Sequence, residues 1–511
     1  MRPESRRRLL GQAAALAGLG LLPGAGLSRP PVGRMAETPF ALGVASGEPS
    51  PDGMVLWTRL APRPWEMGGG MTPEPVAVGW EIAEDPRFQR IAAGGRLYAR
   101  VESAHAVHVE VGGLKPGREY WYRFTAAGHR SPAGRTLTAP APGDRPQRLR
   151  AAFASCQKFE AGYYTAHRHI AESAPDLVLF LGDYIYEKPI SLEGVRHPPI
   201  VEARDLDSYR LRHAVYRSDP DLQASHAAAP WMAIWDDHEV ENDYGGDQDR
   251  RDADPAAFLR RRAAAYQAYY EHMPLRRTSL PVGPQMQLYR RLTWGRLAQI
   301  QFLDARQYRP HRTCDAAAHG REIPAACAER FDPARSLLGA AQEAWLQEGF
   351  RTTRARWNVL AQPYLMSPLK TAEAEVSNDG WDGYVGSYRR VLQGWRDAKV
   401  SNPLALGGDI HSFVAGDLAL TPGGRPIASE FVGGSISSLA RKDALPAQGF
   451  RDNPGLKFGH REHRGYGELE LSAAGCVVTF HAVGDAQRRR SPVQTLARFV
   501  VADGQPGLQR A

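Results

Sequence analysis

Five apolar runs in this sequence are each followed at once by side chains that can ligate metals or take part in catalysis. In chain order the polar segments are Ser155-Cys156-Gln157, Gly182-Asp183-Tyr184-Ile185-Tyr186-Glu187, Asp236-Asp237-His238-Glu239, Asp304-Ala305-Arg306 and Gly407-Gly408-Asp409-Ile410-His411. They follow the runs 149–154, 177–181, 232–235, 297–303 and 403–406, which are predicted to be strands. Ligands of open α/β sheets bind outside the carboxyl ends of the strands, so we expect the five segments to meet at one edge.

These side-chain types suit a site that holds two metal ions and acts on phosphate. Carboxylates and imidazoles bind hard and borderline cations, whereas a phenolate and a thiolate favour an oxidised transition metal such as ferric iron. Two cations can turn water into hydroxide near neutral pH and hold a phosphoryl group during in-line attack. Arg306 adds a planar guanidinium that matches phosphate oxygens.

The five segments differ in how strongly each one indicates a site. Taken alone, Asp183 fits a common turn, Cys156 a small buried residue and Tyr186 a core aromatic. The segment 236–239 is different, because four ionisable residues directly after an apolar strand have no packing explanation. Asp409-Ile410-His411 places two ligand types on the same side of an extended segment. The occurrence of all five in order indicates one functional site.

The elements that must position these segments fall into two domains. From 38 to 138, about seven short apolar runs separated by Pro, Gly and Asp turns predict a β-sandwich of the fibronectin type III kind. A Pro-rich linker follows at 139–148. From 149 to 501, strands alternate with helices such as 257–270 and 339–350, which predicts a layered α/β catalytic domain with two central sheets. The tail 502–511 shows no periodicity and is expected to be disordered.

The first 36 residues are typical of an export signal. Ser5-Arg6-Arg7-Arg8-Leu9-Leu10 precedes the apolar run 13–22, which is too short to span a bilayer comfortably. The paired arginines resemble the twin-arginine export motif, with an ordinary secretory signal as the alternative. We expect recognition by the twin-arginine export machinery, cleavage between Ala25 and Ala36, and a periplasmic or extracellular product without a transmembrane anchor.

The composition is that of a folded protein. Of 511 residues, 43% are hydrophobic and 23% charged, which excludes intrinsic disorder, collagen and a multi-span membrane protein. The formal net charge is +8, and only seven of the 64 basic residues are Lys. A basic surface can attract polyanions. Because no basic block is interleaved with aromatic residues, we expect no specific nucleic-acid partner.

Four cysteines do not make a disulfide framework, but two of them suggest a single bridge. Cys314 and Cys327 lie 13 residues apart in a stretch rich in Pro, Ala and Gly, and we expect a disulfide there in an oxidising compartment. Two free thiols are the alternative. Cys476 opens an apolar strand and is expected to be buried and inert.

The ordered segments resemble the calcineurin-like metallophosphoesterase superfamily and, within it, the PhoD-type alkaline phosphatases. Ser155-Cys156-Gln157 stands where the superfamily has Asp-x-His, and Asp237-His238-Glu239 stands for Asn-His-Glu. Asp183 matches the bridging carboxylate, Tyr186 the tyrosinate ligand of this type, and Asp409-Ile410-His411 the final pair. The resemblance covers nearly the whole chain, since the segments 40–47, 381–384, 430–438 and 464–466 also match later or earlier motifs.

This resemblance implies a site with iron and calcium. On that analogy, Fe³⁺ is held by Cys156, Asp183, Tyr186 and His411. Ca²⁺ is held by Asp183, Asp237 and Asp409, with Asn242 as a further oxygen ligand. The neighbouring carboxylates Asp236, Glu239 and Glu241 leave the calcium ligands open to other assignments.

The resemblance also implies a mechanism and an activity. A metal-bridging hydroxide attacks phosphorus, Arg306 and the cations take up charge, and His238 assists the leaving oxygen. The expected activity is phosphomonoester hydrolysis with an alkaline preference, and the rival is phosphodiesterase or phospholipase D activity at the same metals. A non-catalytic surface binding protein would lack ligands, yet every expected position carries a usable group. A metallopeptidase is disfavoured because the sequence has no His-Glu-x-x-His motif.

Overall fold

The computed structural model describes residues 34–189, 194–249, 254–314, 321–372, 374–440, 445, 450 and 452–511. The predicted signal segment, apart from its last three residues, lies outside the described residues. The protein is a mixed α/β structure with several sheets. Within the described residues, no helix combines the length and the apolar character that crossing a membrane requires.

The largest sheet has ten strands in the order β25-β24-β23-β22-β9-β10-β11-β1-β2-β5. At its centre, β9 (Arg148–Ala154), β10 (Leu177–Leu181) and β11 (Trp231–Ile234) run parallel. All five residues of β10 are buried, as expected for a parallel strand that is covered on both faces. The other strands are β1 (Val44–Ser50), β2 (Gly53–Arg59), β5 (Ala106–Val111), β22 (Arg464–Ser472), β23 (Gly475–Val483), β24 (Val493–Ala502) and β25 (Gln509–Arg510).

A second sheet of seven strands packs against the first, in the order β12-β13-β15-β18-β20-β19-β21. Its strands are β12 (Arg290–Trp294), β13 (Ala298–Phe302), β15 (Trp357–Ala361), β18 (Pro403–Gly407), β19 (Phe413–Leu418), β20 (Ala428–Gly433) and β21 (Leu456–His460). Side chains alternate along β15, so Val359 joins the core shared with the ten-stranded sheet while Leu360 joins a core on the opposite face. The expected pair of central sheets is therefore present.

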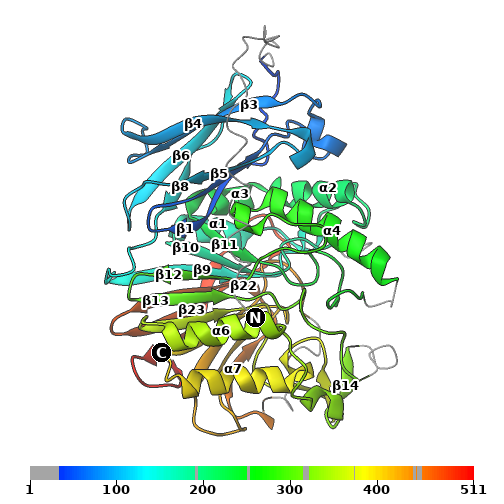
Figure 1. Cartoon of the computed structure of the whole chain (residues 1–511), viewed down its shortest axis with the longest axis vertical. Coiled ribbons are helices and arrows are strands. Elements are labelled where there is room, and N and C mark those ends of the chain that lie inside the picture. Colours follow the sequence, from blue (N-terminus) through cyan, green and yellow to red (C-terminus); the bar gives the residue numbers. More distant parts are fainter. Residues whose placement is uncertain are drawn as a thin grey trace, which may run out of the picture.

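Helices cover the outer faces of both sheets. The helices α6 (Ala340–Thr352) and α7 (Val385–Asp397) pack on the outer face of the seven-stranded sheet, at the lower end of Figure 1. The expected helices 257–270 and 339–350 correspond to α4 and α6. Asp254 caps α4 through the backbone N–H of Ala256, and Pro255 occupies its first turn. In Figure 1, the helices above the two main sheets, toward the N-terminal layer, are α1 (Thr165–Ser173), α2 (Leu206–Arg217), α3 (Pro220–Ala228) and α4 (Pro255–His272).

The N-terminal region forms two facing layers, one of which is part of the ten-stranded sheet. A five-stranded sheet of β3 (Val76–Ala83), β4 (Ile91–Ala99), β6 (Glu119–Ala126), β7 (His129–Arg130) and β8 (Gly134–Leu137) packs on β1, β2 and β5 through one apolar core. However, β1 also pairs with β11, at Gly47 and Trp231. The second layer therefore continues into the central sheet. The fibronectin type III kinship stays a prediction.

The C-terminal residues are ordered, so the expectation of a disordered tail is wrong. Gln509 and Arg510 form β25, which pairs with Val500 and Phe499 of β24. Leu508 is buried in the main core, and its backbone N–H donates to Asp417 over 2.9 Å. One apolar side chain and one hydrogen bond thus anchor a segment whose sequence has no periodic pattern.

A small third sheet and a disulfide lie beside the two main sheets. It consists of β14 (Glu322–Pro324), β16 (Lys370–Ala372) and β17 (Glu375–Ser377). Cys314 and Cys327 form the expected disulfide, and β14 lies between them in sequence. Cys156 and Cys476 are free and buried. The disulfide therefore closes the segment that includes Arg321, directly before β14.

Candidate metal centre

The two sheets bring four of the five predicted strand ends to one place. The parallel register pairs Phe180 with both Ala154 and Ala233, so β9, β10 and β11 end nearly level. The end of β18 in the second sheet meets them through a close approach of Gly408 to Ser155. A Cβ on Gly408 would lie 2.5 Å from Ser155 Oγ, so only glycine fits there.

The backbone at these strand ends adopts an uncommon conformation. Cys156, Asp183, Asp409 and His411 all have a left-handed backbone, with φ of 59°, 57°, 60° and 51°. For residues other than glycine this conformation costs about 1–2 kcal/mol each. Such strain persists where the surrounding structure enforces it, which is typical of functional sites. Four of the residues named from sequence are therefore held in unusual orientations by the fold.

The four predicted iron ligands lie together. Ligand atoms of Cys156, Asp183 and His411 all lie within 4.8 Å of one another. The hydroxyl of Tyr186 donates to Asp183 Oδ2 over 2.8 Å and lies 3.0 Å from His411 Nε2. The backbone carbonyl of Leu439 lies 2.7 Å from His411 Nδ1. With the proton on Nδ1, Nε2 faces the cluster as a free base, the form in which imidazole binds metals.

A chain of buried carboxylates continues from this cluster. Asp183 also forms a group with Asp237 and His238, and Asp237 forms another with Asp243 and Asp379. The backbone N–H of Asp243 donates to Asp237 Oδ2 over 2.6 Å. Asp183 is thus shared by the first two groups, as a bridging ligand must be.

Two of the predicted calcium ligands lie in the same cavity but are engaged differently. Both carboxylate oxygens of Asp409 lie 2.8 Å from Nη2 of Arg321, and Asp409 belongs to none of the three described groups. Asn242 lines the cavity, and its backbone N–H donates to Glu187 Oε1 over 3.1 Å. The structure therefore brings Asp409 and Asn242 to the cavity beside the site, with Asp409 bound to Arg321.

The cluster has the character of a cation site. Asp183 Oδ1 is buried and makes no hydrogen bond among the described residues. Burial raises the pKa of Asp183, of Cys156 and of Tyr186, and the charge of Asp183 raises the last two further. An unpaired carboxylate oxygen, a thiol, a phenol and an imidazole are donors that suit an oxidised transition metal. These residues fit a bound cation.

His238 lies beside the cluster, and Glu187 orients its ring. Its Nδ1 lies 2.7 Å from Glu187 Oε2, and its ring lies 4.1 Å from that of Tyr186. Burial would lower the pKa of His238, but the charges of Asp237, Glu187 and Asp183 outweigh it and raise that pKa well above the usual value. Burial raises the pKa of Glu187, yet the opposing charge of His238 brings it down to about 2. His238 can therefore carry a proton at the cavity wall.

The position of Arg306 contradicts the predicted contact with phosphate. Its side chain is fully buried and does not line the cavity. Its Nε donates to Asp236 over 2.6 Å, and its two terminal nitrogens donate to Asp379 over 2.8 and 2.9 Å. The guanidinium lies 3.5 Å from Asp237. Because three carboxylates surround it, Arg306 supports the site from behind rather than touching a substrate.

Replacing Arg306 with alanine should therefore lower stability first. The change would leave Asp236 and Asp379 as buried carboxylates without this partner, a loss that costs about 3–5 kcal/mol. Urea unfolding measures it, and Arg351→Ala, which removes an exposed ion pair, is the control. Wild-type stability combined with a strongly reduced kcat would restore the direct catalytic role.

Several site residues were not found from sequence. Arg321 lines the cavity and contacts three carboxylates, at 2.8 Å from Asp409, 3.4 Å from Asp379 and 3.6 Å from Asp243. It follows no strand, so no pattern marked it. Glu187 is the last residue of the segment 182–187, which was already predicted to contribute to the site. Its place in that segment could have identified it.

Arg464, the first residue of β22, supports the cluster through the backbone of two neighbouring segments. It is buried, and its Nη1 donates to the backbone oxygens of His411 over 2.9 Å and of Ser438 over 2.6 Å. The side chain of Ser438 in turn donates to the Tyr186 hydroxyl over 2.8 Å. Arg464 therefore fixes two segments that carry the cluster.

A cavity of about 280 Å³ gives access to the cluster. Its polar lining includes Asp183, Asp237, His238, Asp409 and His411, together with Arg321. Tyr364, Leu369 and Trp381 also line it. The cavity thus combines metal ligands, a proton carrier and a guanidinium, which is suited to an anionic substrate.

Comparison with known proteins gives matches over nearly the whole chain. Residues 27–140 match the family model "PhoD-like phosphatase, N-terminal domain", and residues 151–480 match "PhoD-like phosphatase". The chain is 43% identical over 486 residues to alkaline phosphatase D of Bacillus subtilis (strain 168), covering 92% of this chain and 82% of that protein. A solved structure titled "Structure of PhoD" superimposes with a TM-score of 0.89 at 41% identity, covering 94% of this chain and 93% of that one. The chain therefore belongs to the PhoD-like phosphatase family and is a phosphoric ester hydrolase.

Proposed function

We propose that the protein is an exported, metal-dependent phosphomonoesterase with an alkaline preference. Fe³⁺ would be held by Cys156, Asp183, Tyr186 and His411. Ca²⁺ would be held by Asp183 and Asp237, with Asp409 and Asn242 within reach. The observation that carries the proposal is the convergence of Cys156, Asp183 and His411 within 4.8 Å, beside the Tyr186 hydroxyl.

The bound cations would supply Lewis-acid activation of water and neutralise the charge of the phosphoryl group. The chain's own residues perform the other tasks. Asp183 belongs to the group with Cys156 and His411 and to the group with Asp237 and His238, so it could contribute an oxygen to each cation. Arg321 holds Asp409 at the cavity wall, and Arg306 fixes Asp236 and Asp237 from behind.

His238 would deliver the proton that the leaving alcohol needs. Glu187 accepts the hydrogen bond from Nδ1, which leaves Nε2 as the nitrogen that can donate to the leaving oxygen. The carboxylate also orients the ring, as the third member of a catalytic triad does. His238 is thus the catalytic acid of the proposal, and Glu187 is its positioning residue.

Phosphodiester or phospholipid hydrolysis at the same cluster is the second candidate. It is favoured by a second cavity of about 520 Å³, which shares Leu369, Trp381 and Asp382 with the first and gives room for a larger ester. Turnover of a monoester and a diester by one preparation separates the two. A faster diester reaction would overturn the proposed monoester preference but leave the metal ligands as they are.

Export by the twin-arginine machinery is the remaining part of the proposal. It rests on Arg6-Arg7 ahead of the apolar run 13–22. Replacing both arginines with lysine keeps the positive charge, so it should block twin-arginine export but not an ordinary secretory route. Unchanged export of the Lys-Lys form would contradict this part alone.

Elemental analysis of protein purified without chelators tests the metal assignment. We expect iron near one equivalent together with calcium. Cys156→Ser should lower the iron content, whereas Cys476→Ser is a matched control, since Cys476 is the other free, buried cysteine and lies outside the ligand groups. Zinc in place of iron would retain a phosphoester hydrolase but refute the ligand assignment, and protein without stoichiometric metal would refute the metal-dependent mechanism.

A further inference from the structure

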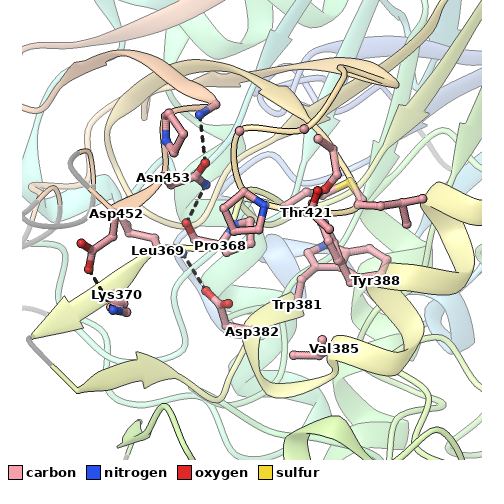
Figure 2. Close-up of a pocket in the computed structure, with 18 of the residues that line it drawn as sticks. Pro368, Leu369, Lys370, Trp381, Asp382, Val385, Tyr388, Thr421, Asp452 and Asn453 are labelled. Carbon is pink, nitrogen blue, oxygen red and sulfur yellow. Dashed lines mark hydrogen bonds and ion pairs between the residues drawn. The ribbon is translucent and has the colours of Figure 1, made fainter.

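A second cavity, of about 520 Å³, lies next to the one at the metal centre. The two cavities share three lining residues, Leu369, Trp381 and Asp382. Figure 2 shows this second cavity, with Trp381 and Asp382 on one side and Pro368 and Leu369 close by. The two cavities therefore adjoin at these residues, and a molecule bound at the metal centre has a large space beside it.

The residues that line both cavities are held in place by hydrogen bonds. The backbone N–H of Leu369 donates to Asp382 Oδ2 over 2.9 Å, a bond drawn in Figure 2. The indole N–H of Trp381 donates to Gln362 Oε1 over 3.0 Å. Trp381 is also part of the core beneath α6 and α7. The shared residues are therefore held in fixed positions, and the second cavity is preformed.

The inside of the second cavity is mainly apolar. Met366, Leu369, Val376, Trp381 and Tyr388 line it although each is 8% exposed or less. Val385, the first residue of α7, and Leu420 are also part of the apolar lining. Cavities of this size with buried aromatic and aliphatic walls are typical of binding sites for apolar groups.

The charges around the second cavity largely neutralise one another. Lys370 pairs with Asp452 over 2.9 Å, Arg330 with Asp382 over 3.3 Å, and Lys457 with Asp417. Arg389 is exposed at the rim. The metal-centre cavity, by contrast, contains His238 and Arg321 beside its carboxylates. The charged end of a ligand thus belongs in the first cavity and an uncharged, apolar part in the second.

We propose that the second cavity binds the apolar alcohol part of a phosphate ester whose phosphoryl group lies at the metal centre. The preferred substrates would then be esters of alkyl or aryl alcohols rather than of small polar alcohols. The inference rests on the proposed phosphoester hydrolysis, and it names the class of alcohol. The inference applies to phosphomonoesters and to phosphodiesters alike.

A series of n-alkyl phosphates from ethyl to octyl tests the proposal, with phosphate release as the readout. If the chain is buried in the second cavity, kcat/KM should rise about two- to fourfold for each added methylene until the cavity is filled. Free 1-octanol should inhibit octyl phosphate hydrolysis competitively, and ethanol should not. Equal kcat/KM along the series would overturn the proposal.

Val385→Asp locates the effect in the second cavity. Aspartate is favourable in the first turn of a helix, so α7 should be retained, while the charge should oppose an alkyl chain. The gain from ethyl to octyl phosphate should fall at least tenfold in this variant. Val282→Asp is the matched control, because Val282 is 79% exposed and lines neither cavity. An unchanged chain-length preference in Val385→Asp would refute this location.

The two proposals fail in different ways. Ethyl phosphate reports on the metal centre alone, so its turnover should be similar in the wild type and Val282→Asp, and the effect of Val385→Asp is measured as the ratio of octyl to ethyl phosphate turnover. Absence of turnover with every ester would refute phosphoester hydrolysis of this class altogether. Turnover of ethyl phosphate without any chain-length preference would refute only the apolar cavity.

Discussion

Replacing Asp183 with asparagine should lower kcat by at least about 10³-fold, equivalent to about 4 kcal/mol of transition-state stabilisation. Asp183 belongs to two of the ligand groups and has an oxygen without a hydrogen-bond partner among the described residues. Asparagine keeps the shape but removes the negative charge that two cations would share. We expect the metal content to fall together with activity, as measured by elemental analysis and phosphate release on one sample.

The control for this substitution is Asp207→Asn. The side chain of Asp207 is 67% exposed and lies in the first turn of α2, so the same chemical change there should leave kcat and metal content unaltered. Unfolding by urea should show that Asp183→Asn still folds. A folded Asp183→Asn protein with full metal content and kcat within tenfold of wild type would contradict the bridging role.

Replacing His238 with alanine should lower kcat by about 10²- to 10⁴-fold, the range for a general acid. The ring lies at the cavity wall, with Glu187 2.7 Å from Nδ1. A general acid matters most when the leaving alcohol is a weak acid. The loss should therefore be large for ethyl phosphate and much smaller for p-nitrophenyl phosphate, whose leaving group needs little protonation.

This dependence on the leaving group separates catalysis from a structural role. A variant that merely disturbs the site should slow both substrates equally. Glu187→Gln should cause a smaller loss with the same dependence, because it weakens only the orientation of the ring. His197→Ala, at an exposed position, is the control. Activity of His238→Ala within twofold of wild type for ethyl phosphate would exclude the acid role.

The site could be predicted from sequence where it depends on strand ends. Cys156, Asp183 and Asp237 follow strands that lie side by side and parallel, so their convergence is a direct consequence of the sheet. Arg306 also follows a strand, but its side chain is bound by Asp379, 73 residues later in the chain. No local pattern shows that a distant carboxylate will bind this arginine behind the cavity. Arg321, which lines the cavity, follows no strand and was not predicted for that reason.

The fold could be predicted where it depends on periodicity. Buried runs such as β10 and the amphipathic α4 and α6 followed from their apolar spacing. The point at which the N-terminal layer ends could not be predicted in this way. Apolar and polar residues alternate along a strand in the same manner whether its sheet ends there or continues into further strands. Only the pairing of β1 with β11 decides this, and it joins segments about 180 residues apart.

The ten-stranded sheet also determines when the site can form during synthesis. The strand before Cys156, β9, pairs on one side with β10 and on the other with β22, which the ribosome makes more than 300 residues later. Arg464, which bonds to the backbone of His411, is the first residue of that late strand. A nascent chain therefore cannot complete the metal cluster until nearly all of it has emerged. Folding of the N-terminal part alone, during synthesis, would therefore not yield the cluster. Complete folding before transport is consistent with the proposed export in the folded state.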